Sequence, residues 1–190
     1  MNKPQIKVAT IDLYNNERNE GMRCIKEIVA DAGKKNFNID LKYDVFETRY
    51  KGDIPDLSYD IFISSGGPGS PFEDEDKQWD KDYFTLLNKI WNHNQTSEQK
   101  KYIFFICHSF QMMARYFQFG EVNKRFINSF GVMPFAKTED GKNDPILKNL
   151  TDPFYAADIR HWQVVNPDQK KIEEFGAKIL SWEIPEEENK

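Results

Sequence analysis

The chain has 190 residues, of which 39% are hydrophobic and 30% charged, and its net charge is -5. This length and apolar content predict a single globular domain over residues 1–184, followed by a charged tail at 185–190. The acidic balance speaks against a nucleic-acid-binding protein, which would need a basic surface. Two cysteines, a polar N-terminus and no long apolar run predict a cytoplasmic protein without structural disulfides, a signal peptide or a membrane span.

The hydrophobic pattern alternates between short apolar runs and amphipathic segments. Apolar residues at helical spacing predict a helix over 22–32, which Gly33 should end, and a second helix over 81–91. A third predicted helix covers 111–119. The expected strands are 6–13, 42–46, 59–64, 102–106, 154–157 and 177–182. This alternation is typical of βαβ units and predicts an α/β fold, with a mainly parallel twisted sheet and helices on both faces.

Cys107 directly follows the most apolar predicted strand, and a predicted helix comes soon after it. A residue at such a turn is held at the carboxyl edge of the sheet, where open α/β folds place their ligands. The nucleophile elbow of hydrolases has this geometry, and the amide after the nucleophile donates to the oxyanion. The positive end of the following helix favours a thiolate. On spacing alone, a buried structural cysteine is an equal alternative.

A glycine-rich run, Ser-Gly-Gly-Pro-Gly-Ser-Pro, follows another predicted strand at 65–71. Adjacent glycines let backbone N–H groups point into a site without side chains in the way. Such a loop can bind a phosphate or complete an oxyanion hole, while a plain tight turn is the alternative. No Lys-Ser or Lys-Thr pair follows, so the run is not a Walker loop.

The glycine loop and the Ile-Cys-His-Ser-Phe-Gln segment at 106–111 together resemble the class I glutamine amidotransferases, whose elbow usually reads Gly-x-Cys-x-Gly-x-Gln. The likeness continues through 120–122 and Gly131, and at 160–165 it is similar to amidotransferases of the GMP synthetase type. It covers the chain from 6 to 182. The resemblance implies a three-layer, flavodoxin-like fold and a glutaminase that supplies ammonia to a synthetase such as GMP synthase.

The resemblance also implies a role for individual residues. Cys107 would attack the side-chain amide of glutamine to form a glutamyl thioester, with the amides of Gly67 and His108 holding the oxyanion. The residues expected to bind the substrate are Gly66, Gln111, Arg160 and His161. We expect no cofactor and no metal, and we expect the acidic run at 73–76 to be a solvated loop. The implied partners are glutamine and an ATP-dependent synthetase domain or subunit.

The chain departs from the family pattern in several places. Ser109 replaces the elbow glycine, Phe105 replaces the glycine before the nucleophile, and Ser129 stands near a family glutamate. The Phe-His-Pro-Glu-like stretch that supplies the activating histidine and glutamate is missing from the sequence. A thiol without a neighbouring base is a poor nucleophile at neutral pH.

Three explanations for the missing base stay open. The sequence lacks a C-terminal segment that carries these residues, or His161 acts as the base, or the domain is a degenerate form that binds without turnover. A cysteine hydrolase of the DJ-1/PfpI group, which shares the elbow, is a further alternative.

Overall fold

The computed structural model describes residues 3–184, so the charged tail predicted at 185–190 lies outside the described residues. The chain divides into two compact units, Met1–Tyr116 and Phe117–Lys190. That residues 1–184 form a single domain stays a prediction. Within 3–184, no helix is both long enough and apolar enough to cross a lipid bilayer.

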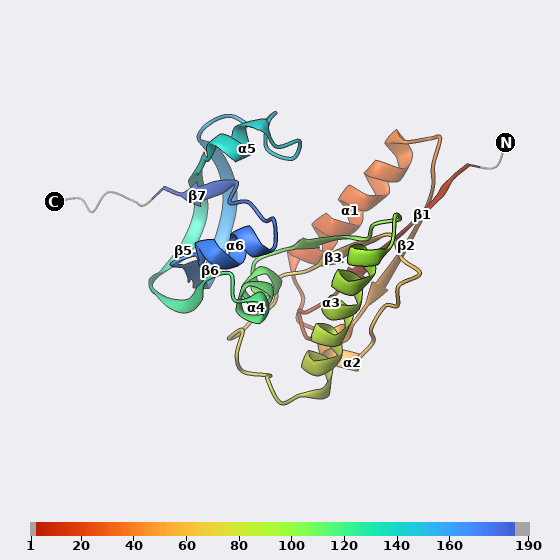
Figure 1. Cartoon of the computed structure of the whole chain (residues 1–190). Coiled ribbons are helices and arrows are strands. Elements are labelled where there is room, and N and C mark those ends of the chain that lie inside the picture. Colours follow the sequence, from red (N-terminus) through yellow and green to blue (C-terminus); the bar gives the residue numbers. More distant parts are fainter. Residues whose placement is uncertain (1–2, 185–190) are drawn as a thin grey trace. The chain divides into compact units, whose positions relative to one another are not determined.

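The first unit holds a four-stranded parallel sheet in the order β2-β1-β3-β4 (Figure 1). Its strands are β1 (Gln5–Ile11), β2 (Asp40–Phe46), β3 (Ile61–Ser64) and β4 (Tyr102–Phe105). Its helices are α1 (Glu20–Lys35), α2 (Thr48–Lys51), α3 (Gln78–Thr96) and α4 (His108–Phe117). Parallel strands need crossover connections, and the helices between successive strands supply them.

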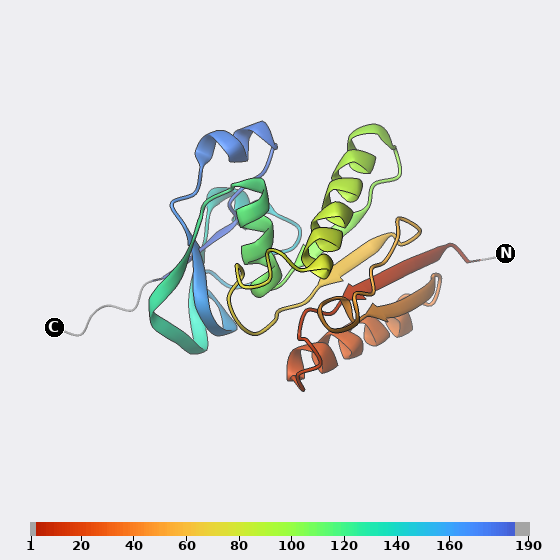
Figure 2. The same ribbon diagram turned by 90° about the horizontal axis from the view of Figure 1, so that it is seen from below.

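Helices α1 and α3 lie on opposite faces of this sheet (Figure 2). On one face, Ile25 and Val29 of α1 pack with Val8 of β1 in a buried apolar cluster. On the other face, the hydroxyl groups of Tyr83 in α3 and Ser64 at the end of β3 are 2.9 Å apart and hydrogen-bonded. The predicted α/β class, with a parallel sheet between layers of helices, is confirmed.

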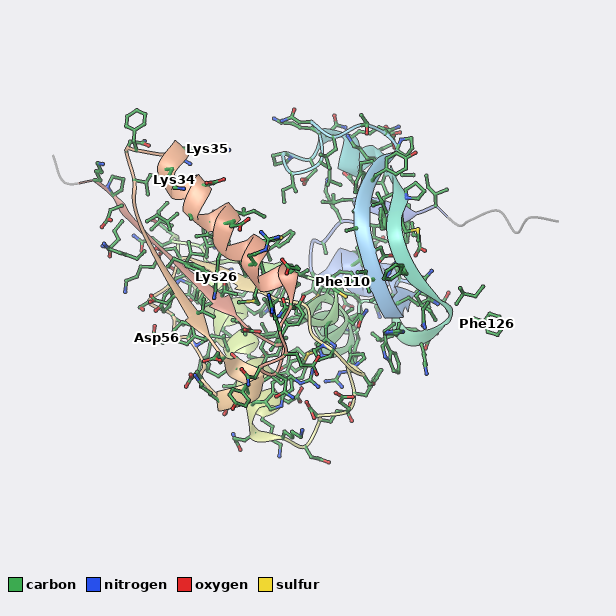
Figure 3. The ribbon with its side chains drawn as sticks, turned by 180° about the vertical axis from the view of Figure 1, so that it is seen from behind. Lys26, Lys34, Lys35, Asp56, Phe110 and Phe126 are labelled. Atoms are coloured by element: carbon green, nitrogen blue, oxygen red, sulfur yellow. The ribbon has the colours of Figure 1, made fainter. Side chains whose placement is uncertain are left out.

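The prediction that Gly33 ends the first helix is wrong. α1 continues to Lys35 because Asn36 caps it: both the backbone and the side-chain N–H groups of Asn36 donate to the carbonyl oxygen of Ala32. Gly33 does not adopt the left-handed conformation that a terminating glycine takes. Lys34 also lies in the last turn (Figure 3), where positive charge complements the helix dipole.

The second unit is built around a three-stranded antiparallel sheet in the order β6-β5-β7. Its elements are β5 (Glu121–Lys137), α5 (Glu139–Asn143), β6 (Phe154–Val165), α6 (Gln169–Glu174) and β7 (Ser181–Glu183). The pairing of β5 with β6 shifts register between Lys124 and Ser129, and Phe126 in this irregular stretch is fully exposed (Figure 3). This antiparallel sheet was not among the predicted features.

Candidate active site

Cys107 occupies the turn between β4 and α4, and its φ angle is 51°. This is the left-handed region, which costs an L-residue about 1–2 kcal/mol. The turn is closed by the N–H of Gln111, which donates to the carbonyl oxygen of Cys107 at 3.1 Å. Cys107 is exposed, so the alternative of a buried structural cysteine is wrong.

Ser109, which stands where the family has its elbow glycine, is fully buried beneath this turn. Its hydroxyl accepts a hydrogen bond from the N–H of Ile106 at 2.9 Å and donates one to the carbonyl oxygen of Ser64 at 2.8 Å. Ser64 ends β3 and Ile106 follows β4, so the serine joins the ends of two neighbouring strands. The strained turn is therefore compatible with a side chain at this position.

The glycine loop lies directly beside Cys107. A Cβ at Gly66 would be 3.7 Å from the Cβ of Cys107 and 3.0 Å from the hydroxyl of Tyr14. A Cβ at Gly67 would be 2.6 Å from the carbonyl oxygen of Leu13, closer than backbone atoms tolerate, so glycine is required there. The proximity follows from the topology, because β3 and β4 are adjacent parallel strands whose carboxyl ends share one edge.

A buried arginine fixes the far side of the glycine loop. The Arg49 guanidinium donates from Nη1 to the carbonyl oxygen of Pro68 at 2.7 Å and from Nε to the Asp74 carboxylate at 2.9 Å. A third hydrogen bond, from Nη2, reaches Glu73, whose carboxylate also accepts the N–H of Ser70. The expectation of a solvated acidic run is wrong for Asp74, which is buried because Arg49 neutralises it.

His108 and Gln111, both predicted site residues, are buried in α4. Burial lowers the pKa of His108 to about 4, and the positive charge of Arg49 acts in the same direction. The imidazole is therefore uncharged at neutral pH. Among the described residues, no group of three or more histidine, cysteine, aspartate or glutamate side chains is arranged to hold a metal ion.

The other two predicted substrate-binding residues, Arg160 and His161, lie on β6 in the second unit. The Arg160 guanidinium pairs with the carboxylates of Asp158 at 2.9 Å and Glu183 at 2.5 Å. Asp158 also accepts a hydrogen bond of 2.6 Å from the hydroxyl of Ser129. Contact of Arg160 and His161 with a substrate stays a prediction.

Two residues close to the site, Tyr14 and Arg49, were not found by sequence reasoning. They follow β1 and β2, and the carboxyl ends of these strands lie at the same edge as those of β3 and β4. Only the order of the strands in the sheet shows that these two residues lie near the site. No local sequence pattern specifies that order. Burial raises the pKa of Tyr14, and the charges of Cys107 and Asp12 raise it further.

No family model and no curated protein matches the chain by sequence. Solved structures do match. A glutamine amidotransferase from Thermotoga maritima is similar with a TM-score of 0.64 and 19% identity, over 85% of this chain and 63% of that one. A glutamine amidotransferase from Methylobacillus flagellatus gives a TM-score of 0.57 at 11% identity, over 87% of this chain and 59% of that one. A GMP synthase subunit homologue from Thermoplasma acidophilum gives 0.55 at 17% identity, over 86% of this chain and 69% of that one.

The chain therefore has the fold of the class I glutamine amidotransferases, and the predicted resemblance is confirmed at the level of the fold. The Thermoplasma homologue of GMP synthase is among the proteins that share this fold. The chain spans less than two thirds of the length of the Thermotoga and Methylobacillus structures.

Proposed function

We propose that the chain is a glutamine-hydrolysing domain of the amidotransferase type, with Cys107 as its nucleophile. One observation carries the proposal: Cys107 is exposed, adopts a φ of 51° between β4 and α4, and lies beside the loop of Gly66 and Gly67. An L-residue held in this conformation at a sheet edge is typical of a nucleophile elbow.

The proposed reaction starts with attack of the Cys107 thiolate on the side-chain carbonyl carbon of glutamine. The amides of Gly67 and His108 would donate to the tetrahedral oxyanion, each contributing about 3–4 kcal/mol. A general acid–base group that took the thiol proton would pass it to the leaving nitrogen, so breaking of the carbon–nitrogen bond releases ammonia and leaves a glutamyl thioester. Water then hydrolyses the thioester to glutamate and returns the free thiol. Substrate contacts in the first unit would come from Gly66 and Gln111, and a role for Arg160 and His161 stays a prediction. In the cytoplasm the ammonia would pass to an ATP-dependent synthetase, and the Thermoplasma GMP synthase homologue supports that type of partner.

A second candidate, a domain that binds glutamine without hydrolysing it, is favoured by the state of the nearby histidine. A general base needs a pKa near the working pH. The pKa of His108 is about 4 because the residue is buried, so its imidazole is a weak acceptor for the thiol proton. His93, at the end of α3, is hydrogen-bonded through Nε2 to the carbonyl oxygen of Gln99. That His161 acts as the base stays a prediction.

The two candidates are separated by combining affinity labelling with a glutaminase assay. A diazo-ketone analogue of glutamine should alkylate Cys107, and excess glutamine should protect it. Cys24 is also exposed and serves as an internal control, because glutamine should not protect it. Glutamate release that Cys107→Ala abolishes supports the hydrolase. Protection without glutamate release supports the binding domain, and equal, unprotected labelling of both cysteines contradicts both candidates.

A further inference from the structure

The tip of the Tyr14 side chain lies between two glycines from different elements. A Cβ at Gly21, in the first turn of α1, would be 2.6 Å from the Tyr14 hydroxyl oxygen. A Cβ at Gly66 would be 3.0 Å from the same atom. Both distances are shorter than ordinary packing contacts, so the hydroxyl takes up space that any larger residue at either position would need.

This hydroxyl and the side chain of Cys107 flank the same glycine. A Cβ at Gly66 would be 3.0 Å from the Tyr14 hydroxyl and 3.7 Å from the Cβ of Cys107, so both side chains contact the space beside this glycine. The charge of an ionised Cys107 raises the pKa of Tyr14, in keeping with the short distance between the two side chains. Burial, the larger cause, also raises the pKa of Tyr14, so its phenol stays protonated at neutral pH and can donate a hydrogen bond.

The backbone around Tyr14 is fixed by neighbouring strand ends. The N–H of Leu13 donates to the hydroxyl of Ser65 at 2.9 Å, and the N–H of Tyr14 donates to the Asp12 carboxylate at 2.8 Å. The N–H of Asp12 donates to the carbonyl oxygen of Phe46 at 2.8 Å. The segment is therefore tied to the ends of β2 and β3, which holds the phenol in place before any ligand binds.

We propose that Tyr14 is a positioning residue for the nucleophile: its hydroxyl donates a hydrogen bond to the thiolate of Cys107 and so favours ionisation of the thiol. A hydrogen bond to the charged form of an acidic group, such as a thiolate, lowers the pKa of that group. This role concerns the thiol alone and does not depend on which substrate the thiolate attacks.

Other ionisable groups also face this region. Burial raises the pKa of Asp12, on which the charges of Glu47 and Lys26 act in opposite directions. Burial lowers the pKa of His108 to about 4, so its ring is uncharged where a free thiol titrates, at about pH 8.5. A change in the titration of Cys107 on loss of the phenol oxygen therefore reports on Tyr14 and not on these groups.

The test measures how the alkylation rate of Cys107 by iodoacetamide depends on pH, in a Cys24→Ser background. Tyr14→Phe removes one oxygen and should raise the midpoint by about one pH unit, which slows alkylation about tenfold below the midpoint. Tyr43→Phe is the matched control. Tyr43 is another half-buried tyrosine of this unit, and its hydroxyl bonds to Thr10 at 3.0 Å, so its loss should leave the midpoint unchanged.

Gly21→Ala tests the same contact from outside the site. Alanine is favourable in a helix, but its Cβ would displace the Tyr14 hydroxyl, so the midpoint should rise as it does in Tyr14→Phe. In the Tyr14→Phe background, Gly21→Ala should add nothing. An unchanged midpoint in folded Tyr14→Phe, or a Gly21→Ala effect that persists in that background, overturns the proposal. Glutamine plays no part in the assay, so its outcome is independent of the proposed hydrolysis.

Discussion

The hydroxyl of Ser109 donates a hydrogen bond of 2.8 Å to the carbonyl oxygen of Ser64, which joins the first turn of α4 to the end of β3. The same hydroxyl accepts a hydrogen bond from the N–H of Ile106, the residue that precedes Cys107. A side chain therefore anchors the turn that carries Cys107. Because Gly66 follows Ser64 and Ser65 directly, Ser109 also links this turn to the start of the glycine loop.

Removing this hydroxyl should destabilise the fold. Ser109→Ala deletes a buried group with two hydrogen-bond partners, and we expect the free energy of unfolding to fall by about 1–3 kcal/mol. Ser109→Gly should cost roughly 0.5–1 kcal/mol more, because glycine gives the unfolded chain extra freedom. Urea denaturation of both variants measures the difference. Unchanged stability in Ser109→Gly would mean that the turn does not depend on the serine.

The left-handed backbone of Cys107 predicts an unusual order of stability among its variants. Glycine adopts a φ of 51° without steric cost, whereas alanine retains the strain. Cys107→Gly should therefore be more stable than Cys107→Ala by about 1 kcal/mol, although glycine normally destabilises a folded chain. Thermal melting of the pair is the measurement, and the reverse order would argue against strain at this residue.

The first unit was largely predictable from the sequence because its strands are short segments rich in apolar residues and its longer helices are amphipathic. The ends of elements were less accurate. α1 runs beyond Gly33 because Asn36 caps it, and α3 runs to Thr96, five residues beyond the predicted end at 91. In both cases polar residues on an exposed helix carry no periodic apolar signal.

The second unit and the surroundings of Cys107 were harder to predict. β5 spans 17 residues with an internal register shift, so no simple alternation marks it. Tyr14 and Arg49 lie near the glycine loop because of the order of the strands in the sheet, and local sequence does not specify that order. Cys107 and the loop were found because each directly follows an apolar strand.

The Arg49 ion pairs should make a large contribution to stability. Among the residues that the structure describes, Arg49→Ala leaves Lys77 as the ion-pair partner of the buried Asp74 carboxylate, and we expect the free energy of unfolding to fall by about 3–5 kcal/mol. Burial by itself would raise the pKa of Asp74, but Lys77 and Arg49 together hold it below its usual value. Arg49→Ala should therefore also reduce the loss of stability on acidification, since a lowered carboxylate pKa stabilises the fold only above that pKa.

A double-mutant cycle separates the interaction between Arg49 and Asp74 from the general effects of truncating either side chain. If the charges act on each other, Asp74→Ala should cost much less in the Arg49→Ala background than in the parent chain. Denaturation of the four proteins at one pH gives the coupling free energy. Additive losses would show that Arg49 stabilises the fold through its contacts with Pro68 and Glu73 and through packing, and not through Asp74.

Asp80 and His108 should have opposite effects on stability as the pH changes. Burial raises the pKa of Asp80 to about 6, with Arg115 opposing the shift. Because its pKa in the unfolded chain is about 3.9, the folded state binds more protons between the two values, and stability falls as the pH rises through that range. The pKa of His108 is about 4 in the folded chain, below its value of about 6.5 in the unfolded chain. Its contribution to the free energy of unfolding therefore rises as the pH rises over nearly the same range. The contributions of these two residues to the free energy of unfolding therefore largely cancel between about pH 4 and 6.

Asp80→Asn removes the contribution of Asp80 and leaves that of His108. The variant should match the parent at about pH 4, where Asp80 is already protonated, and exceed it by roughly 2–3 kcal/mol at pH 7. His108→Gln should do the reverse, with stability that declines as the pH rises from about 4 to 6. Urea denaturation at several pH values measures each profile. Parallel profiles for Asp80→Asn and the parent would show that Asp80 ionises normally in the fold, and that its nearby Arg115, at 3.7 Å, offsets the effect of burial.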